Sequence, residues 1–208
     1  MWMTRRDSLF STLHSNPKAK FVTRAVQFGS EPLFDHVLSA DDLATQVKSA
    51  QQNLSDLSIP VTVSDMAYGY QSNDGAQSVL NAIDFVDLHM LPYFSTTATT
   101  ASDSWGFIQN DLDWITTRVN GKKIILSENG WPAMESGSTV SSSPTAVADL
   151  QQSQDYFDLL DSNCQQLKSN PGGGVAWFAH LYSVDQDPSY GVLSNGEPQF
   201  SFSPKTSC

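Results

Sequence analysis

Residues 122–132 read Lys-Lys-Ile-Ile-Leu-Ser-Glu-Asn-Gly-Trp-Pro, and they join a short apolar run to a sharp turn. A run such as Ile124 to Leu126 is typical of a strand in a parallel sheet, which is covered on both faces. Glu128 follows this run, immediately before the turn at Gly130-Trp131-Pro132. The stretch therefore predicts a parallel strand over residues 122–127 with a carboxylate at its carboxyl end.

Similar apolar runs recur along the chain, separated by stretches with helical periodicity. The expected strands are residues 21–28, 59–63, 85–91, 122–127 and 175–180. The expected helices are residues 3–14, 39–57, 74–83, 102–120 and 144–168, and residues 181–208 are expected to be loop with one further helical turn. This alternation predicts an α/β domain over residues 1–208, with a parallel sheet and crossover helices. An open doubly wound sheet and part of a (β/α)8 barrel both fit this order of elements.

Two of the expected helices carry recognisable start signals. Ser39 can cap the first turn of its helix, with Asp42 three residues further on as an acidic variant of the capping box. Pro144 follows Ser143 and is expected at the first position of the longest helix, where its missing N–H does no harm.

The composition excludes several classes of partner. Lys and Arg together number 11 and Asp and Glu 22, so the net charge is −11, which does not suit nucleic acid or an anionic membrane. No apolar run approaches the ~20 residues of a membrane span, and residues 1–11 lack the apolar stretch of a secretory signal. The four histidines lack the spacing of metal ligands, so we expect no metal. We also expect that the protein needs no cofactor and is a monomer.

Functional groups in both architectures gather where parallel strands end. A carboxylate, a histidine or aromatic rings lie at the carboxyl end of every expected strand. They are Glu31, Asp65, Tyr68, His89, Tyr93, Glu128, Trp131, Trp177 and His180. Two carboxylates surrounded by aromatic rings suit glycoside chemistry, in which one protonates the leaving oxygen and the other attacks the anomeric carbon or activates water. Catalytic roles are therefore expected for Glu31 and Glu128, and sugar-binding roles for the others.

Each of these residues also has a structural alternative. Glu31, Glu128 and Asp65 also fit the role of a helix cap or an ion-pair partner, although the turn after Glu128 favours a functional role for that residue. His89 and His180 fit the role of core histidines with satisfied nitrogens. The two tryptophans of the helical stretch 102–120, Trp105 and Trp114, are expected to pack rather than to bind sugar.

The motif at residues 124–132 resembles the signature of glycoside hydrolase family 17, the β-1,3-glucanases and glucanosyltransferases. Residues 26–35, 67–70, 89–94 and 174–180 resemble further motifs of its fungal cell-wall members. The resemblance implies a (β/α)8 barrel, a retaining mechanism on β-1,3-glucan, Glu128 as nucleophile and Glu31 as general acid/base. It also implies an extracellular or cell-wall protein. The chain departs from the family at Ser30, where related barrels have Asn, and at Asn129, where many plant members have a small residue.

In this barrel superfamily the acid ends strand four and the nucleophile ends strand seven. Glu31 ends the first expected strand and Glu128 the fourth, so the chain is expected to hold about strands 4 to 8 of an incomplete barrel. The remaining strands and a signal peptide are expected before Met1, and the chain alone is expected to be poorly stable and weakly active. A glucan-binding protein without catalysis and an open doubly wound binding domain are the alternatives. Cys164 is expected either to pair with Cys208 or to have a partner in the absent region.

Overall fold

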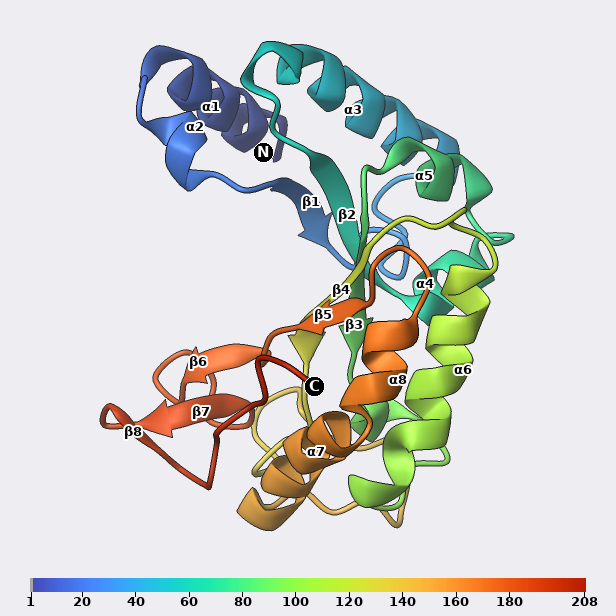
Figure 1. Cartoon of the computed structure of the whole chain (residues 1–208), viewed down its shortest axis with the longest axis vertical. Coiled ribbons are helices and arrows are strands. Elements are labelled where there is room, and N and C mark those ends of the chain that lie inside the picture. Colours follow the sequence, from blue (N-terminus) through green and yellow to red (C-terminus); the bar gives the residue numbers. More distant parts are fainter. Residues whose placement is uncertain (1) are drawn as a thin grey trace. The chain divides into compact units, whose positions relative to one another are not determined.

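The computed structural model describes residues 2–208, and the chain divides into two units, one ending at Asp87 and the other starting at Leu88. The boundary lies within β3, Val86–Met90, so the two units are described in turn. Figure 1 traces the elements of both along the chain. Among residues 2–208, no helix is both long enough and apolar enough to cross a membrane.

The first unit is built on parallel strands. β1 (Val26–Ser30) and β2 (Val61–Met66) pair in parallel, with Val26 opposite Val61, and β3 begins beside β2. The helices are α1 (Trp2–Ser15), α2 (Ala19–Val22), α3 (Ala40–Asn53), α4 (Ala67–Ser72) and α5 (Gln77–Ala82), with a 3-10 turn η1 at Ser55–Leu57. The buried face of α3 is formed by Leu43, Ala44, Val47 and Ala50, whose spacing of three to four residues places them on one side of the helix.

The second unit continues from β3 through β4 (Ile124–Asn129) to β5 (Val175–Trp177). β4 and β5 are parallel, with Ile124 opposite Val175. The helical elements are η2 (Pro92–Phe94), η3 (Ser102–Ser104), α6 (Trp105–Thr116), α7 (Leu150–Ser162) and α8 (Cys164–Ser169). A small second sheet joins β6 (Leu181–Ser183), β7 (Gly191–Ser194) and β8 (Glu197–Pro198), shown in red in Figure 1.

Several element boundaries differ from the sequence predictions. Phe21 and Val22 belong to α2, so the first strand starts only at Val26. The helix predicted over residues 144–168 was wrong over residues 144–149. α7 starts at Leu150, where Asp149 caps it by accepting a hydrogen bond from the Gln152 amide at 2.7 Å, and Asn163 separates α7 from α8. The loop predicted over residues 181–208 was wrong as well, because it contains β6 to β8.

The position of Ser143 explains why the predicted helix does not start there. The Ser143 hydroxyl donates a hydrogen bond to the carbonyl of Ala98 at 2.6 Å and is buried. This partner lies 45 residues away in the sequence, so local capping preference is overridden by a tertiary contact.

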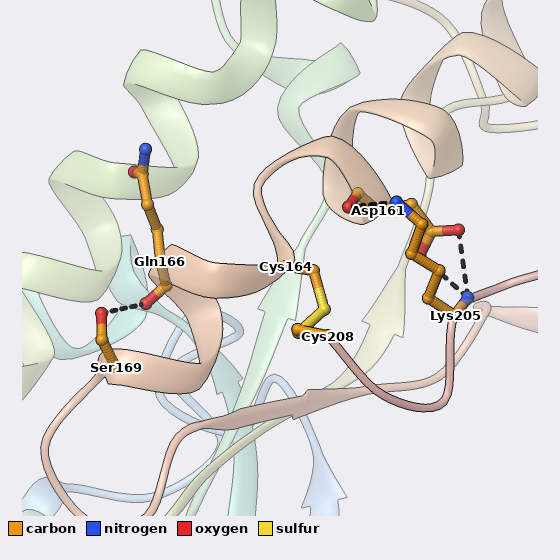
Figure 2. The surroundings of a disulfide bond; sticks show 6 residues. All are labelled: Asp161, Cys164, Gln166, Ser169, Lys205 and Cys208. Atoms are coloured by element: carbon orange, nitrogen blue, oxygen red, sulfur yellow. Dashed lines mark hydrogen bonds between the residues drawn. A yellow bond between two sulfur atoms is a disulfide. The ribbon is translucent and has the colours of Figure 1, made fainter.

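A disulfide ties the C-terminus to the helices of the second unit. Cys164, the first residue of α8, is bonded to Cys208, with a Cα–Cα distance of 5.7 Å, as Figure 2 shows. The Lys205 amide also donates to the Asp161 carboxylate at 3.0 Å. Of the two alternatives left open for Cys164, the structure shows the pairing with Cys208. Closing a separation of 44 residues stabilises the unit by about 4 kcal/mol in the chain-entropy treatment.

Candidate active site

In the second unit, Glu128 stands at the end of β4 with a half-buried side chain that is 24% exposed. The Nε2 atom of His89, on β3, lies 3.2 Å from its Oε1 atom, and the Nδ1 atom of His180 lies 3.7 Å from its Oε2 atom. His89 is buried, so its ring cannot turn freely to solvent. Two imidazoles therefore face one carboxylate, an arrangement that holds its oxygens in a fixed orientation.

The backbone around Glu128 is fixed by the residue that follows it. Asn129 is fully buried, and its side-chain oxygen accepts a hydrogen bond from the Tyr156 hydroxyl at 2.6 Å. The His180 amide donates to the Asn129 carbonyl at 3.0 Å, which ties the end of β5 to the end of β4. Burial raises the pKa of Tyr156 well above its ordinary value, so its hydroxyl remains a hydrogen-bond donor.

Two aromatic rings expected at the sugar site lie below the surface. Tyr93 and Trp131 are almost completely buried, with ring centroids 5.2 Å apart in an edge-to-face arrangement. The Trp131 indole donates to the Val147 carbonyl at 2.9 Å, and the Tyr93 hydroxyl donates to Glu135 at 2.5 Å. Burial and Glu135 together raise the pKa of Tyr93 to about 12. These rings support the turn after β4 from within the unit.

Other aromatic rings of the second unit are open to solvent. Phe178 and Tyr182 follow β5 and are exposed, whereas Trp177 is half-buried and stacks on Phe157 at 5.6 Å. Sequence reasoning selected Trp177 and missed Phe178. The alternation of side chains along a strand could have indicated that neighbouring rings face opposite ways.

In the first unit, Glu31 follows β1 directly and adopts a left-handed backbone conformation with φ of 55°. Its amide donates to the Ser64 carbonyl at 2.9 Å, and its side chain is half-buried. Nearby, Tyr68 is 60% exposed and meets the ring of Phe34, 39% exposed, edge to face at 6.1 Å. Phe34 was not selected from the sequence, although it lies in the stretch 26–35.

Asp65, which is expected as a sugar ligand, lies on β2. Its side chain is fully buried, and its two oxygens accept hydrogen bonds from the amides of Leu33 at 2.7 Å and Met66 at 2.9 Å. The carboxylate therefore serves the fold's own backbone, which is close to the capping role weighed as its structural alternative.

Trp105 and Trp114 lie on α6, as expected. The Trp105 indole donates to Gln166 at 3.2 Å, and the Trp114 ring lies under the Arg118 guanidinium at 4.1 Å. Both rings contact helical neighbours, in agreement with a packing role.

Residues 3–188 match the profile of a family described as the BtgE/BtgC glycoside hydrolase domain. The chain belongs to this family. The matched residues include both glutamates and every expected sugar-binding residue of this glycoside hydrolase domain.

Two curated relatives of the chain are fungal. The chain is 25% identical over 151 residues to "Probable beta-glucosidase btgE" of Aspergillus terreus, covering 69% of the chain and 26% of that protein. It is 26% identical over 165 residues to "Probable glucan endo-1,3-beta-glucosidase eglC" of Aspergillus oryzae, covering 76% of the chain and 33% of that protein. The chain thus spans about a quarter to a third of the length of these relatives.

Solved structures show the fold of the chain. A glycoside hydrolase family 17 β-1,3-glucanosyltransferase from Rhizomucor miehei matches with a TM-score of 0.73 and 20% identity, over 94% of this chain and 69% of that one. An active-site mutant of the same enzyme in complex with laminaritriose matches equally, over 96% and 70%. The expected α/β barrel class is confirmed, and the chain corresponds to part of such a barrel.

Proposed function

We propose that this chain carries the catalytic centre of a retaining glycoside hydrolase or transglycosidase that acts on β-1,3-glucan. The observation that carries the proposal is the placement of Glu128 at the end of β4, with His89 at 3.2 Å and His180 at 3.7 Å from its carboxylate. A carboxylate oriented by neighbours at the carboxyl end of a barrel strand is suited to attack an anomeric carbon.

The proposed reaction has two steps. In the first, a Glu128 oxygen bonds to the anomeric carbon while the glycosidic C–O bond breaks, and Glu31 gives its proton to the leaving oxygen. In the second, Glu31 takes a proton from water or from a sugar hydroxyl, whose oxygen displaces Glu128 from the anomeric carbon. Water gives hydrolysis and a sugar hydroxyl gives a transferred glucan.

The substrate class is supported by the names of the relatives. One is named as an endo-1,3-β-glucosidase, and a protein of the same fold is a β-1,3-glucanosyltransferase crystallised with laminaritriose. We extend this to a fungal protein of the extracellular space or cell wall, active as a monomer, in which residues 1–208 act as one partial barrel domain. Tyr68, Trp177 and His180 are proposed to meet the glucan.

The test is a comparison of Glu128→Gln with Glu197→Gln, a matched change at an exposed position on β8. Products from laminarin and laminaritriose are separated by chromatography. We expect Glu128→Gln to lose more than about 10³-fold in turnover while Glu197→Gln remains unchanged, because only the first removes a nucleophile. Retained turnover in Glu128→Gln would reject the assignment.

A glucan-binding protein without catalysis predicts a different pattern. In that case the unaltered chain binds laminaritriose, measured by calorimetry, yields no product, and Glu128→Gln binds as tightly as the unaltered chain. This pattern would replace the enzyme proposal by the binding alternative.

A further inference from the structure

The turn that follows Glu31 is held at one residue by two side chains. The Leu33 amide donates to Oδ2 of Asp65 at 2.7 Å, and the Leu33 carbonyl accepts from Nδ2 of Asn73 at 3.1 Å. Leu33 is itself fully buried. Both polar groups of one backbone unit are thus bound by residues 32 and 40 positions further along the chain.

The Asp65 carboxylate is built into this place. Its second oxygen accepts from the Met66 amide at 2.9 Å, and the side chain has no exposed surface. A buried carboxylate is tolerated only where donors replace its water, and backbone amides do so here.

Gly69 leaves the space that the carboxylate occupies. A Cβ atom at this position would lie 2.1 Å from Oδ1 of Asp65, closer than any real contact. The Gly69 carbonyl also accepts from Nδ2 of Asn73 at 2.8 Å. We name Asp65, Gly69 and Asn73 the Leu33 clamp.

The clamp acts two residues from a strained position. Glu31 has φ of 55°, which a side chain other than glycine adopts only where its surroundings impose it. Before the turn, its amide is bound to the Ser64 carbonyl at 2.9 Å, and within the turn its carbonyl accepts from the Asp35 amide at 2.8 Å. The clamp constrains the chain after Glu31, so the backbone on both sides of Glu31 is bound to β2 and to Asn73, the residue that follows α4.

We propose that Asp65 is a positioning residue that acts through Leu33 to hold Glu31 in its left-handed conformation. This rests on the proposed function, in which Glu31 is the general acid/base. In this proposal Asp65 supports catalysis without touching glucan, and Asn73 has the same positioning role.

A pair of substrates distinguishes positioning from sugar binding. The sugar that leaves when laminaritriose is cleaved is a poor leaving group, and its oxygen must be protonated. The dinitrophenolate that leaves a dinitrophenyl β-laminaribioside needs no proton. We expect Asp65→Asn to lower kcat on laminaritriose by roughly 10²-fold, because a displaced acid protonates poorly. On the dinitrophenyl substrate the rate of the first step should change less than about 3-fold, and KM should stay nearly constant.

The controls separate this role from stability and from substrate contact. Asp56→Asn, a change at an exposed carboxylate of the same unit, should leave both substrates unaffected. Asn73→Ala should reproduce the substrate selectivity of Asp65→Asn in a weaker form, which covers the case in which Asp65→Asn does not fold. Equal losses on both substrates, or a rise in KM alone, would overturn the proposal.

An NMR readout is independent of turnover. In the unaltered chain the Leu33 amide should exchange slowly with solvent, and in Asp65→Asn it should exchange faster while the Glu31 amide signal shifts. If the unaltered chain shows no turnover at all, the proposed function fails but this readout still tests the clamp. Unchanged Leu33 and Glu31 signals in Asp65→Asn would overturn it.

Discussion

The carboxyl ends of β1 and β4 each carry a glutamate, and the structure holds the two glutamates by different contacts. The turn after β1 fixes Glu31 through its backbone, which is left-handed at Glu31 and clamped at Leu33 by Asp65. At the end of β4, Glu128 remains within the strand, and the rings of His89 on β3 and of His180 after β5 lie against its carboxylate. A nucleophile needs a fixed oxygen, which direct neighbours supply. At Glu31 the backbone is anchored on both sides, which fixes where the residue stands.

The largest expected effect contrasts the two glutamates directly. On a dinitrophenyl β-laminaribioside, Glu128→Gln should lose more than about 10³-fold, whereas Glu31→Gln should still form the covalent intermediate because this leaving group needs no acid. Stopped-flow release of dinitrophenolate measures that first step. Equal loss in both variants would remove the proposed division of roles.

Removing the disulfide should affect one turn and spare the other. Cys208 is bonded to the start of α8, which follows α7, and α7 carries Tyr156, the partner of Asn129. Cys164→Ser with Cys208→Ser should lower the free energy of unfolding of the second unit by about 4 kcal/mol. Hydrogen exchange checks it: the Gly130 amide should lose protection and the Leu33 amide should keep it. Parallel losses at both amides would contradict this separation.

Gly69→Ala should damage the turn after β1 without touching the turn after β4. The added methyl would lie 2.1 Å from the Asp65 carboxylate, so the clamp must open. Overpacking of this kind typically costs about 1–3 kcal/mol, to be measured by urea denaturation. Gly106→Ala, at a helical glycine with open space around its Cβ position, is the matched control and should not destabilise. An unchanged midpoint in Gly69→Ala would show that the carboxylate is not held where the structure places it.

The smallest effect concerns the residue after the nucleophile. Tyr156→Phe removes the 2.6 Å hydrogen bond to the Asn129 side chain and should cost about 1–3 kcal/mol of stability, since a buried acceptor loses its donor. We also expect a fall in kcat on every substrate, because Asn129 adjoins Glu128. A loss of kcat only on substrates with poor leaving groups would instead indicate that Tyr156 affects the acid/base, Glu31, and not the nucleophile.

Much of the chain's local structure could be predicted from residue pattern. Ser39 accepts a hydrogen bond from the Asp42 amide at 3.1 Å, as the capping box predicts, and the helix at residues 2–15 matches its apolar stripe. The apolar runs located β2 to β5 to within a few residues. The signal is continuous in β2 and β3, which are buried on both faces. β6 to β8 left none, because strands of two to four residues are too short to show a period.

For the candidate site, the sequence by itself determined which residues stand where parallel strands end, and hence that Glu31 and Glu128 follow β1 and close β4. The tertiary structure decided which of these side chains face solvent and which serve the fold. Trp131 is buried because Tyr93 and the Val147 carbonyl, 38 and 16 residues away, receive its ring and its N–H. Asp65 is buried because the Leu33 amide, 32 residues away, needs an acceptor. Strand and helix patterns are short-range consequences of side-chain alternation and backbone hydrogen bonding, whereas burial and polar partnership depend on residues that only folding brings together.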